Sequence, residues 1–299
     1  MLAWFYFIVL SVFAWGPSFF FIKLSLKELG PLNIVAWRIS IGLVFLCVIA
    51  FLTKVKFPRD KKSVIHMAIL GVINTALPFT LITIAGREID SILAGAIHGS
   101  IPLLTMLLAA LVITNERLTG PKLVGCLFGF AGLMVLLSEN VNFSGIAISG
   151  HWYGILIMMS AAVSNAVGAV YSRLTVKDLN PLCVATASMA SATVFMWSAV
   201  GLSEEPFTIP TLLSTHVSLF WLGAIGSGLA YYMFFYLIQA WGAGKTTMVA
   251  YAIPVTTIII GIVLLDEVLT WRITIATSLI LLGVYAAINL EKIRLLRKA

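Results

Sequence analysis

The chain has 299 residues, of which 61% are hydrophobic and 10% are charged, and its formal net charge at pH 7 is +7. Soluble domains have about 25% charged residues, so this sequence has too few charges to cover a surface in water. With a mean hydropathy of +1.06, the composition excludes an ordinary soluble domain and indicates an integral membrane protein.

Charged residues and turn signals divide the chain into ten apolar stretches, and most of them reach the roughly 20 residues that a helix needs to cross a bilayer. In chain order, the predicted transmembrane helices are residues 3–22, 31–53, 63–86, 91–113, 121–138, 152–173, 181–202, 217–240, 246–265 and 271–290. We interpret the first as a span rather than a secretory signal, because residues 1–22 contain no basic region and no small-residue cleavage site follows.

Lysine and arginine define the predicted orientation, because they gather on the cytoplasmic side of membrane proteins. With the N-terminus inside, 14 of the 19 basic residues fall on the inner side, 4 fall on the outer side, and Arg38 falls within a span. Both termini are therefore predicted to be cytoplasmic, with anionic lipid at the inner face. Nucleic acid is not a predicted partner, since the basic residues are scattered over loop ends.

The second half of the chain repeats the first with an offset of 150 or 151 residues. The matching pairs are LKELGPL at 26–32 with VKDLNPL at 176–182, ERLT at 116–119 with EVLT at 267–270, SIP at 100–102 with AIP at 252–254, and Gly132 with Gly283. Such a repeat indicates two structural units, here 1–145 and 146–299, with five helices each. Because five is odd, the second unit enters the membrane from the opposite side. The predicted fold is therefore an all-α integral membrane protein of ten transmembrane helices, arranged as two inverted five-helix repeats, a symmetry frequent in secondary transporters.

The repeated acidic turn precedes the last helix of each unit. Inversion places Glu116 at the inner surface and Glu267 at the outer surface, so the two cannot form one site. We expect a local role, in which Thr119 and Thr270, or the acidic groups, cap the start of the next helix.

These features together resemble the EamA family of the drug/metabolite transporter superfamily. The resemblance covers essentially the whole chain and rests on the ten spans, the paired halves, AWGPSFFFIKLSLKELGPLNIVAWR at 14–38, and the ERLT and DEVLT turns before a Gly-rich or apolar helix. It implies efflux of small metabolites, often amino acids or their derivatives, in a plan similar to aromatic amino acid, threonine/homoserine and cysteine-pathway exporters. It also implies a central cavity lined chiefly by the first, third, fourth, sixth, eighth and ninth helices.

Four prolines fall inside predicted spans: Pro17, Pro78, Pro102 and Pro254. A proline inside a helix leaves a backbone carbonyl without its partner and bends the helix. In lipid, this is tolerated where protein or a water-filled cavity satisfies the carbonyl. The prolines are therefore candidates for hinges or cavity lining, with simple packing kinks as the alternative.

Polar and aromatic side chains gather at the same depth. The candidates for substrate contact are Trp15, Ser18, Asn74, His98, Asn165, Ser227, Tyr231 and Tyr251. A few hydrogen-bonding groups among apolar walls suit a small amphipathic solute. Hydrogen bonds between helices and ordinary core packing are the alternatives. His98 is the only ionisable side chain placed near the centre of a span, so it is the candidate for proton or substrate contact.

Arg38 lies about two turns inside the second span. We expect it to play a structural role or to extend its side chain to the interface, and attraction of a substrate carboxylate is the alternative. Gly125, Gly129 and Gly132 form a small-residue packing face, which joins either the two halves or two subunits. Cys47, Cys126 and Cys183 are expected to be small apolar core residues.

The predicted function is secondary transport, by alternating access, that exports small metabolites such as amino acids or related amphipathic solutes. No carboxylate is placed at mid-membrane, no complete P-loop motif is present, and no nucleophile–base or metal-ligand motif falls inside the spans. No cofactor or metal is therefore predicted, and a channel-like facilitator or an intramembrane enzyme is the alternative function. We expect a bacterial inner membrane location, and the sequence leaves monomer and homodimer open.

Overall fold

The computed structural model describes residues 2–113, 120–137 and 152–296. Within those residues, helices are the only regular secondary structure, as the sequence predicts. The helices of the first half are α1 (Leu2–Ile8), η1 (Val9–Trp15), α2 (Ser18–Ser25), α3 (Pro31–Leu52), α4 (Lys61–Leu70), η2 (Gly71–Ala76), α5 (Leu77–Glu88), α6 (Ser91–His98), α7 (Ile101–Val112) and α8 (Gly120–Leu137).

The second half has a similar order of long and interrupted helices, except that its first span, α9, is continuous. Its elements are α9 (Trp152–Thr175), α10 (Pro181–Leu202), α11 (Leu213–Phe220), η4 (Trp221–Leu229), α12 (Ala230–Trp241), α13 (Ala243–Thr246), η5 (Thr247–Tyr251), α14 (Ala252–Leu265) and α15 (Trp271–Leu296). Read as continuous rods, eight of the described helices are long and apolar enough to cross a membrane. The shorter apolar segments Leu123–Gly132 and Trp271–Gly283 lie in α8 and α15, where the sequence places two further spans.

The repeated GPL and NPL motifs start equivalent helices. Pro31 is the first residue of α3 and Pro181 is the first residue of α10. Proline suits this position because its nitrogen has no hydrogen to leave unpaired and its φ angle is already helical. The side chain of Asn180 adds a cap, since its oxygen accepts a hydrogen bond from Leu182 N at 2.9 Å.

Five of the spans are interrupted, four of them near their centres and the ninth close to its start. Three contain π-helical segments (η1, η2 and η4), the fourth bends between α6 and α7, and the ninth passes through the 3₁₀ segment η5. Such departures from the α-helix leave backbone groups unpaired and are frequent at functional sites. The interruptions lie in spans one, three, four, eight and nine, all of which the family resemblance places around a cavity.

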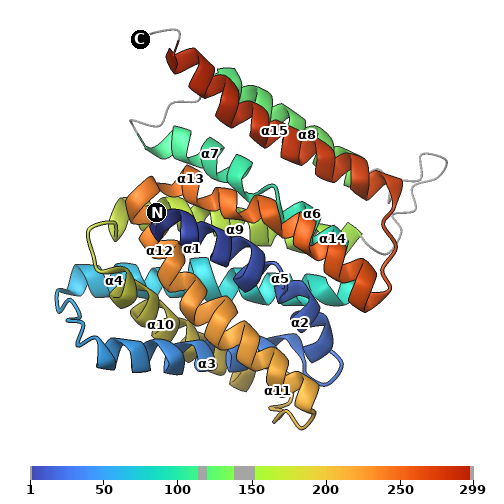
Figure 1. Cartoon of the computed structure of the whole chain (residues 1–299). Helices are drawn as coiled ribbons and strands as arrows, with labels where there is room; N and C mark the ends of the chain where they lie inside the picture. The colour runs from blue at the N-terminus through green and yellow to red at the C-terminus, as the bar shows by residue number, and fades with distance from the viewer. Residues whose placement is uncertain (1, 114–119, 138–151, 297–299) are drawn as a thin grey trace.

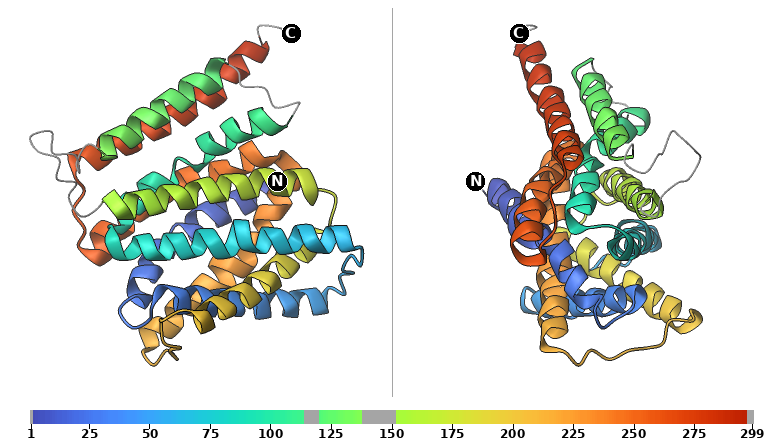
Figure 2. Two further views of the ribbon diagram at one scale, coloured as in Figure 1. Left: turned by 180° about the vertical axis from the view of Figure 1, so that it is seen from behind. Right: turned by 90° about the vertical axis from the view of Figure 1, so that its right-hand side faces the viewer.

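The helices lie roughly side by side as a membrane bundle (Figure 1), and α8 and α15 form a close pair at one edge of it, as both turned views show (Figure 2). The glycine face of α8 packs into this pair. A Cβ atom at Gly132 would approach Ala276 O to 2.8 Å, and one at Gly283 would approach Gly125 O to 2.6 Å. The small residues therefore join the two halves, which decides between the two alternatives left by the sequence.

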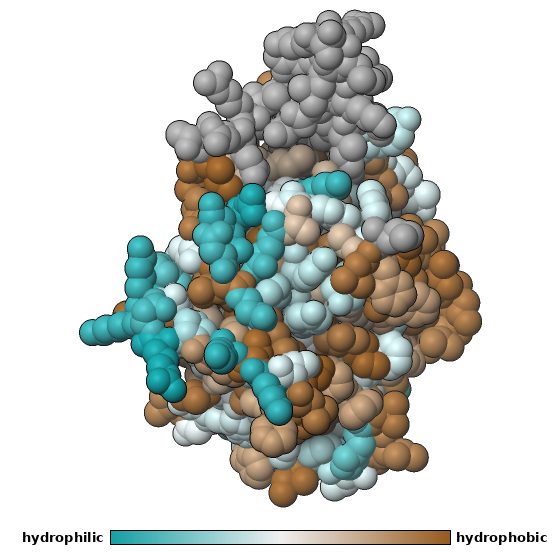
Figure 3. Space-filling view, turned by 60° about the vertical axis from the view of Figure 1, so that its left-hand side comes forward, coloured by the Kyte–Doolittle hydropathy of each residue, from teal (hydrophilic) through white to brown (hydrophobic). Residues whose placement is uncertain are grey.

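The surface separates into polar and apolar parts. Hydrophilic side chains gather at the end of the molecule where α3 leads into α4, beside an apolar flank (Figure 3). Lys54, Lys56 and Arg59 are exposed at this end, whereas Val44 and Phe51 of α3 are 64% and 82% exposed. A row of exposed apolar side chains between polar ends is the pattern of a lipid-facing helix.

The acidic turn before α15 has the expected local role and a second role at a distance. Thr270 Oγ1 accepts a bond from Ile273 N at 3.3 Å, so the threonine caps the next helix as predicted. Glu267, however, accepts from Ser91 N at 2.9 Å and Ile92 N at 3.0 Å, and it therefore caps α6 of the other half. The equivalent residues Glu116 and Thr119 lie outside the described residues.

Candidate functional site

A cavity lies between the two halves at the level of the helix interruptions. The space between its walls, including the part that is open to solvent, is about 660 Å³. The lining residues are Trp15, Ser18, Phe19, Ile22, Arg38, Asn74, Phe79, Ile82, His98, Ile101, Asn165, Tyr231, Phe234, Thr247, Val249, Ala250 and Ile253. All six helices implied by the resemblance contribute, and α3 adds Arg38.

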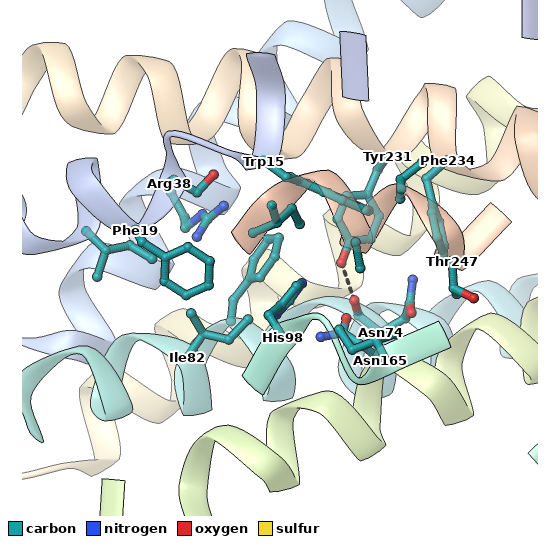
Figure 4. Close-up of a pocket in the computed structure, with 17 residues that line it drawn as sticks. Trp15, Phe19, Arg38, Asn74, Ile82, His98, Asn165, Tyr231, Phe234 and Thr247 are labelled. Carbon is teal, nitrogen blue, oxygen red and sulfur yellow. Dashed lines mark hydrogen bonds between the residues drawn. The ribbon is translucent and has the colours of Figure 1, made fainter. Parts of the chain in front are cut away.

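Six of the eight predicted contact residues line this cavity: Trp15, Ser18, Asn74, His98, Asn165 and Tyr231. They come from five different spans, so only the tertiary fold brings them together (Figure 4). Their contact with a substrate stays a prediction.

Two predicted contact residues lie elsewhere. Ser227 is fully buried and does not line the cavity; its hydroxyl donates to Leu222 O at 2.7 Å and accepts from Arg38 Nε at 3.2 Å. Tyr251 packs beside Leu103 and Met106 in a separate apolar cluster. Both placements have the same cause. Residues one helical turn apart share a helix face, but this spacing does not show how much of that face borders the cavity.

The four predicted kink prolines all fall at changes in helix type. Pro17 separates η1 from α2, Pro78 follows η2 at the start of α5, Pro102 is the second residue of α7, and Pro254 is the third residue of α14. The helix breaks agree with the expected bends, and motion about them stays a prediction.

Side chains of the second half satisfy backbone carbonyls that the interruptions leave open. Pro78 has no N–H for the carbonyl of Asn74, four residues earlier, and the hydroxyl of Tyr231 donates to that oxygen (Figure 4). Ser164 Oγ donates to Ile73 O at 2.7 Å. In lipid, carbonyls freed by a helix break must find donors on neighbouring helices, and these two bonds supply them. They also connect η2 to α9 and α12.

A side chain of the first half also bonds to a backbone carbonyl of the second half. Trp15 of η1 donates from Nε1 to Gly226 O of η4 at 3.0 Å. Two π-helical segments from opposite halves therefore meet beside the cavity, and the bond orients the indole ring along the cavity wall.

Aromatic rings form much of the wall. Trp15 lies 6.2 Å from Tyr231 and 5.6 Å from Phe234, between ring centroids. Phe79 lies 5.6 Å from Tyr231. Edge-to-face and tilted pairs of this kind stabilise one another and hold the rings in place, so the wall is rigid and mostly apolar.

Arg38 does not extend to the interface, and the expectation of a side chain reaching the membrane surface is wrong. The residue is only 2% exposed, and its guanidinium carbon lies 3.8 Å from the centroid of Phe79. The reason is close packing between α3 and η4: a Cβ atom at Gly42 would come within 2.9 Å of Gly223 O. The two backbones approach so closely that the arginine side chain is directed into the bundle.

Two lining residues carry polar atoms with no hydrogen-bond partner among the described residues: Asn74 Nδ2 and His98 Nδ1. A buried polar atom left without a partner costs about 1–3 kcal/mol. A Cβ atom at Gly168 would overlap the side-chain oxygen of Asn74 and come within 2.6 Å of its Cβ. The glycine thus makes the space that Asn74 occupies.

Sequence reasoning missed most of the apolar lining and Thr247. The phenylalanines and isoleucines of the wall resemble the many others that fill the spans, so no local pattern distinguishes them. Phe79 is the one aromatic lining residue here that its neighbours could have indicated, because it directly follows Pro78, and Asn74 lies one turn before that proline.

Comparison with known proteins identifies relatives over the whole chain. The chain is 26% identical to an uncharacterized transporter of Archaeoglobus fulgidus over 94% of this chain and 97% of the relative. It is 28% identical to the uncharacterized transporter YcxC of Bacillus subtilis, over 95% and 92%. It is 25% identical to the uncharacterized inner membrane transporter YedA of Escherichia coli K12, over 91% and 88%.

The fold has a solved counterpart. A crystal structure matches with a TM-score of 0.72 at 22% identity, over 97% of this chain and 96% of the other. The model of the EamA-like transporter family matches this chain twice, at residues 2–138 and 152–289. This chain, a multi-pass helical membrane protein, therefore belongs to the EamA-like transporter family.

Proposed function

We propose that this protein is a secondary transporter that exports small amphipathic metabolites, such as amino acids or related solutes, by alternating access around the central cavity. The observation that carries the proposal is the cavity itself, which both halves line at the depth where five spans are interrupted. Discontinuous helices around a central site are the usual construction of such carriers.

The cavity wall supports a small amphipathic substrate. Aromatic and aliphatic side chains dominate the lining, and the polar groups are few and come from different helices. Ligand sites commonly combine apolar and aromatic walls with a few polar groups that fix the orientation of the ligand. The lining of this cavity therefore suits one small amphipathic metabolite.

The fourth and ninth spans support alternating access, because the break of the fourth span packs against Pro254, three residues after the interruption of the ninth. A Cβ atom at Gly99, between α6 and α7, would come within 3.0 Å of Pro254 in α14. Bends that meet in this way can transmit a change in one half to the other. In an inverted repeat, an exchange of conformations between the halves opens the cavity to the opposite side.

The membrane placement in this proposal is the bacterial inner membrane with both termini in the cytoplasm. Exposed Lys54, Lys56 and Arg59 at one end of the bundle support the orientation, because basic residues favour the cytoplasmic side. The relative YedA is named as an inner membrane transporter.

Counterflow in proteoliposomes tests the proposal. Vesicles with purified protein are loaded with an unlabelled amino acid or related solute, and uptake of the labelled solute is followed. A carrier gives saturable, transient accumulation above equilibrium. Flux that rises linearly with concentration and shows no acceleration from the opposite side would contradict it and indicate a channel.

Paired variants on α9 test the cavity. Asn165→Ala changes a lining residue, and Val163→Ala changes an exposed position on the same helix. We expect a lower apparent affinity for the first variant and unchanged flux for the second, at equal amounts of inserted protein.

A further inference from the structure

Arg38 is a buried cation whose structural contacts are all neutral. Its Nε donates to Ser227 Oγ at 3.2 Å, and its guanidinium carbon lies 3.8 Å from the centroid of Phe79. No carboxylate lies among the residues that line the cavity, and the sequence places its acidic residues at loops and helix ends. The described residues therefore provide no counter-ion for this charge.

A charge in this position is costly unless something pairs with it. Removal of an ion from water is strongly unfavourable, and buried charges are normally paired. An aromatic face gives only part of the compensation. Because Arg38 lines the cavity, a ligand can supply the missing negative charge.

We propose that the cavity binds organic monocarboxylates, with the carboxylate at Arg38 and the apolar or aromatic body along the aromatic wall. The inference rests on the proposed transport function and names the substrate class of the same site. A guanidinium suits this role because its planar array of N–H donors matches the two oxygens of a carboxylate.

The shape of the cavity agrees with one charged end and one apolar body. Arg38 and Thr247 lie at opposite ends of the lining, with Trp15, Tyr231 and Phe234 along the wall toward Thr247 (Figure 4). A carboxylate held at the arginine end directs the rest of the molecule along these rings.

The arginine is held in position before a ligand arrives. Ser227 accepts its Nε–H, which leaves the other guanidinium nitrogens for a ligand. Glycines on both helices allow the close approach, since a Cβ atom at Gly228 would come within 3.0 Å of Gly42 O. A donor fixed in this way loses little freedom when it binds a carboxylate, which increases affinity.

Net charge separates a monocarboxylate from an amino acid. A bound monoanion makes the arginine and ligand neutral together. A zwitterion leaves the positive charge uncompensated, and its ammonium group finds no carboxylate in the described lining. A cationic ligand adds a second positive charge to the same low-dielectric space. The expected order of affinity is therefore acid, then amino acid, then amine.

Four ligands with the same phenyl body test the proposal: 3-phenylpropionate, 3-phenylpropanol, phenylalanine and 2-phenylethylamine. Equilibrium binding to the purified full-length protein at pH 7.5 is measured by titration calorimetry. We expect the acid to bind about tenfold or more tightly than the alcohol, the effect of one charge-assisted contact. We expect a similar margin over phenylalanine and the amine, because each brings an ammonium group that nothing in the described lining neutralises. Equal or tighter binding of the alcohol, amino acid or amine, or no detectable binding of the acid, would overturn the proposal.

Variants test whether Arg38 causes the preference for the acid over the alcohol. Arg38→Gln should remove the preference for acid over alcohol, and Arg38→Lys should keep part of it. Arg87→Gln, at an exposed position outside the cavity, should leave it unchanged. Retention of the full preference in Arg38→Gln would assign it to another group and overturn the proposal. If this variant does not fold, the four-ligand series on the wild-type protein still decides.

The two proposals fail in different ways. Binding of 3-phenylpropionate without counterflow of any solute would contradict the carrier function and leave the carboxylate site intact. Counterflow of phenylalanine without tighter binding of the acid would contradict the carboxylate site and leave the carrier function intact.

Discussion

At the scale of single residues, the cavity depends on contacts that admit little change. The Asn74 side chain occupies the space left by Gly168, and its carbonyl, freed by Pro78, accepts from Tyr231. The conformation of Asn74 is therefore fixed by residues from both halves. Its unpaired Nδ2 atom is held in a single orientation, which is the condition for a specific hydrogen bond to a ligand.

Gly168→Ala tests this arrangement. The added methyl group would overlap Asn74 Oδ1, and an overpacked site costs about 1–3 kcal/mol. We expect a lower melting temperature and weaker substrate binding. Gly201→Ala is the matched control, because a Cβ atom there has nothing within 4 Å. Wild-type affinity in Gly168→Ala would show that the orientation of Asn74 does not matter to the ligand.

At the scale of elements, three carboxylates link the halves at one face of the bundle. Glu205 accepts from Asn33 N at 3.0 Å and so caps α3, Glu267 caps α6, and Glu28 accepts from Leu212 N at 3.2 Å, immediately before α11. Each negative charge meets a helix N-terminus, which carries a partial positive charge. At the opposite face, the halves meet through His66 Nδ1 and Tyr171 Oη at 2.7 Å and through Lys245, whose Nζ lies 5.3 Å from the ring centroid of Trp4.

A neighbouring pair of glutamates tests these links. Glu205→Gln removes the charge that binds α3, whereas Glu204→Gln changes an exposed neighbour. Hydrogen bonds to charged groups contribute about 1.5–3 kcal/mol. We expect Glu205→Gln to increase maleimide labelling of a cysteine placed at Ile22, a cavity position, with labelling in Glu204→Gln unchanged. Equal labelling in both variants would mean that this link does not control access.

The Glu28 link has a defined dependence on pH. Hydrogen bonds from Thr211 hold the pKa of Glu28 at about 2, below its usual value of 4.5. A lowered pKa contributes stability that is present above the unfolded value and is lost as the pH falls through the folded value. In thermal melts, the difference between wild type and Glu28→Gln should therefore stay constant down to about pH 4.5 and shrink toward pH 2. A difference that grows on acidification would contradict the assignment.

At the scale of the whole molecule, the pairing of equivalent elements organises the bundle. Gly99, at the break of the fourth span, packs against Pro254 of the ninth span, and the last helix of each half packs against the other through Gly132 and Gly283. Elements with the same position in the two halves therefore meet across the molecule. This is the arrangement expected of two units related by an axis in the membrane plane.

Cysteine labelling tests the orientation. In a variant without its three native cysteines, single cysteines at Arg59 and at Thr208 should react from opposite sides of the membrane, the first from the cytoplasm. The reason is the excess of basic residues at the end that contains Arg59, since such residues favour the cytoplasmic side. Labelling of both from one side would contradict the predicted crossings between them.

Hydropathy and the internal repeat are sufficient to predict the fold class and most helix boundaries of this protein. Hydropathy predicts spans at 31–53 and 181–202, and the helices occupy Pro31–Leu52 and Pro181–Leu202. The agreement has a physical basis, because in lipid each span must satisfy its own backbone hydrogen bonds, so local composition largely decides the structure. The same rule predicts helix breaks at the four prolines inside spans, and changes of helix type occur there.

Only the tertiary structure decided which face of each helix meets the cavity. Ser227 and Tyr231 are one turn apart, yet the first supports Arg38 and the second lines the cavity. Arg38 is buried because α3 and η4 approach at Gly42 and Gly223, a contact between residues about 180 positions apart. Hydropathy measures whether a residue tolerates lipid or protein around it, but the rotation of a helix depends on its packing against partners distant in the sequence.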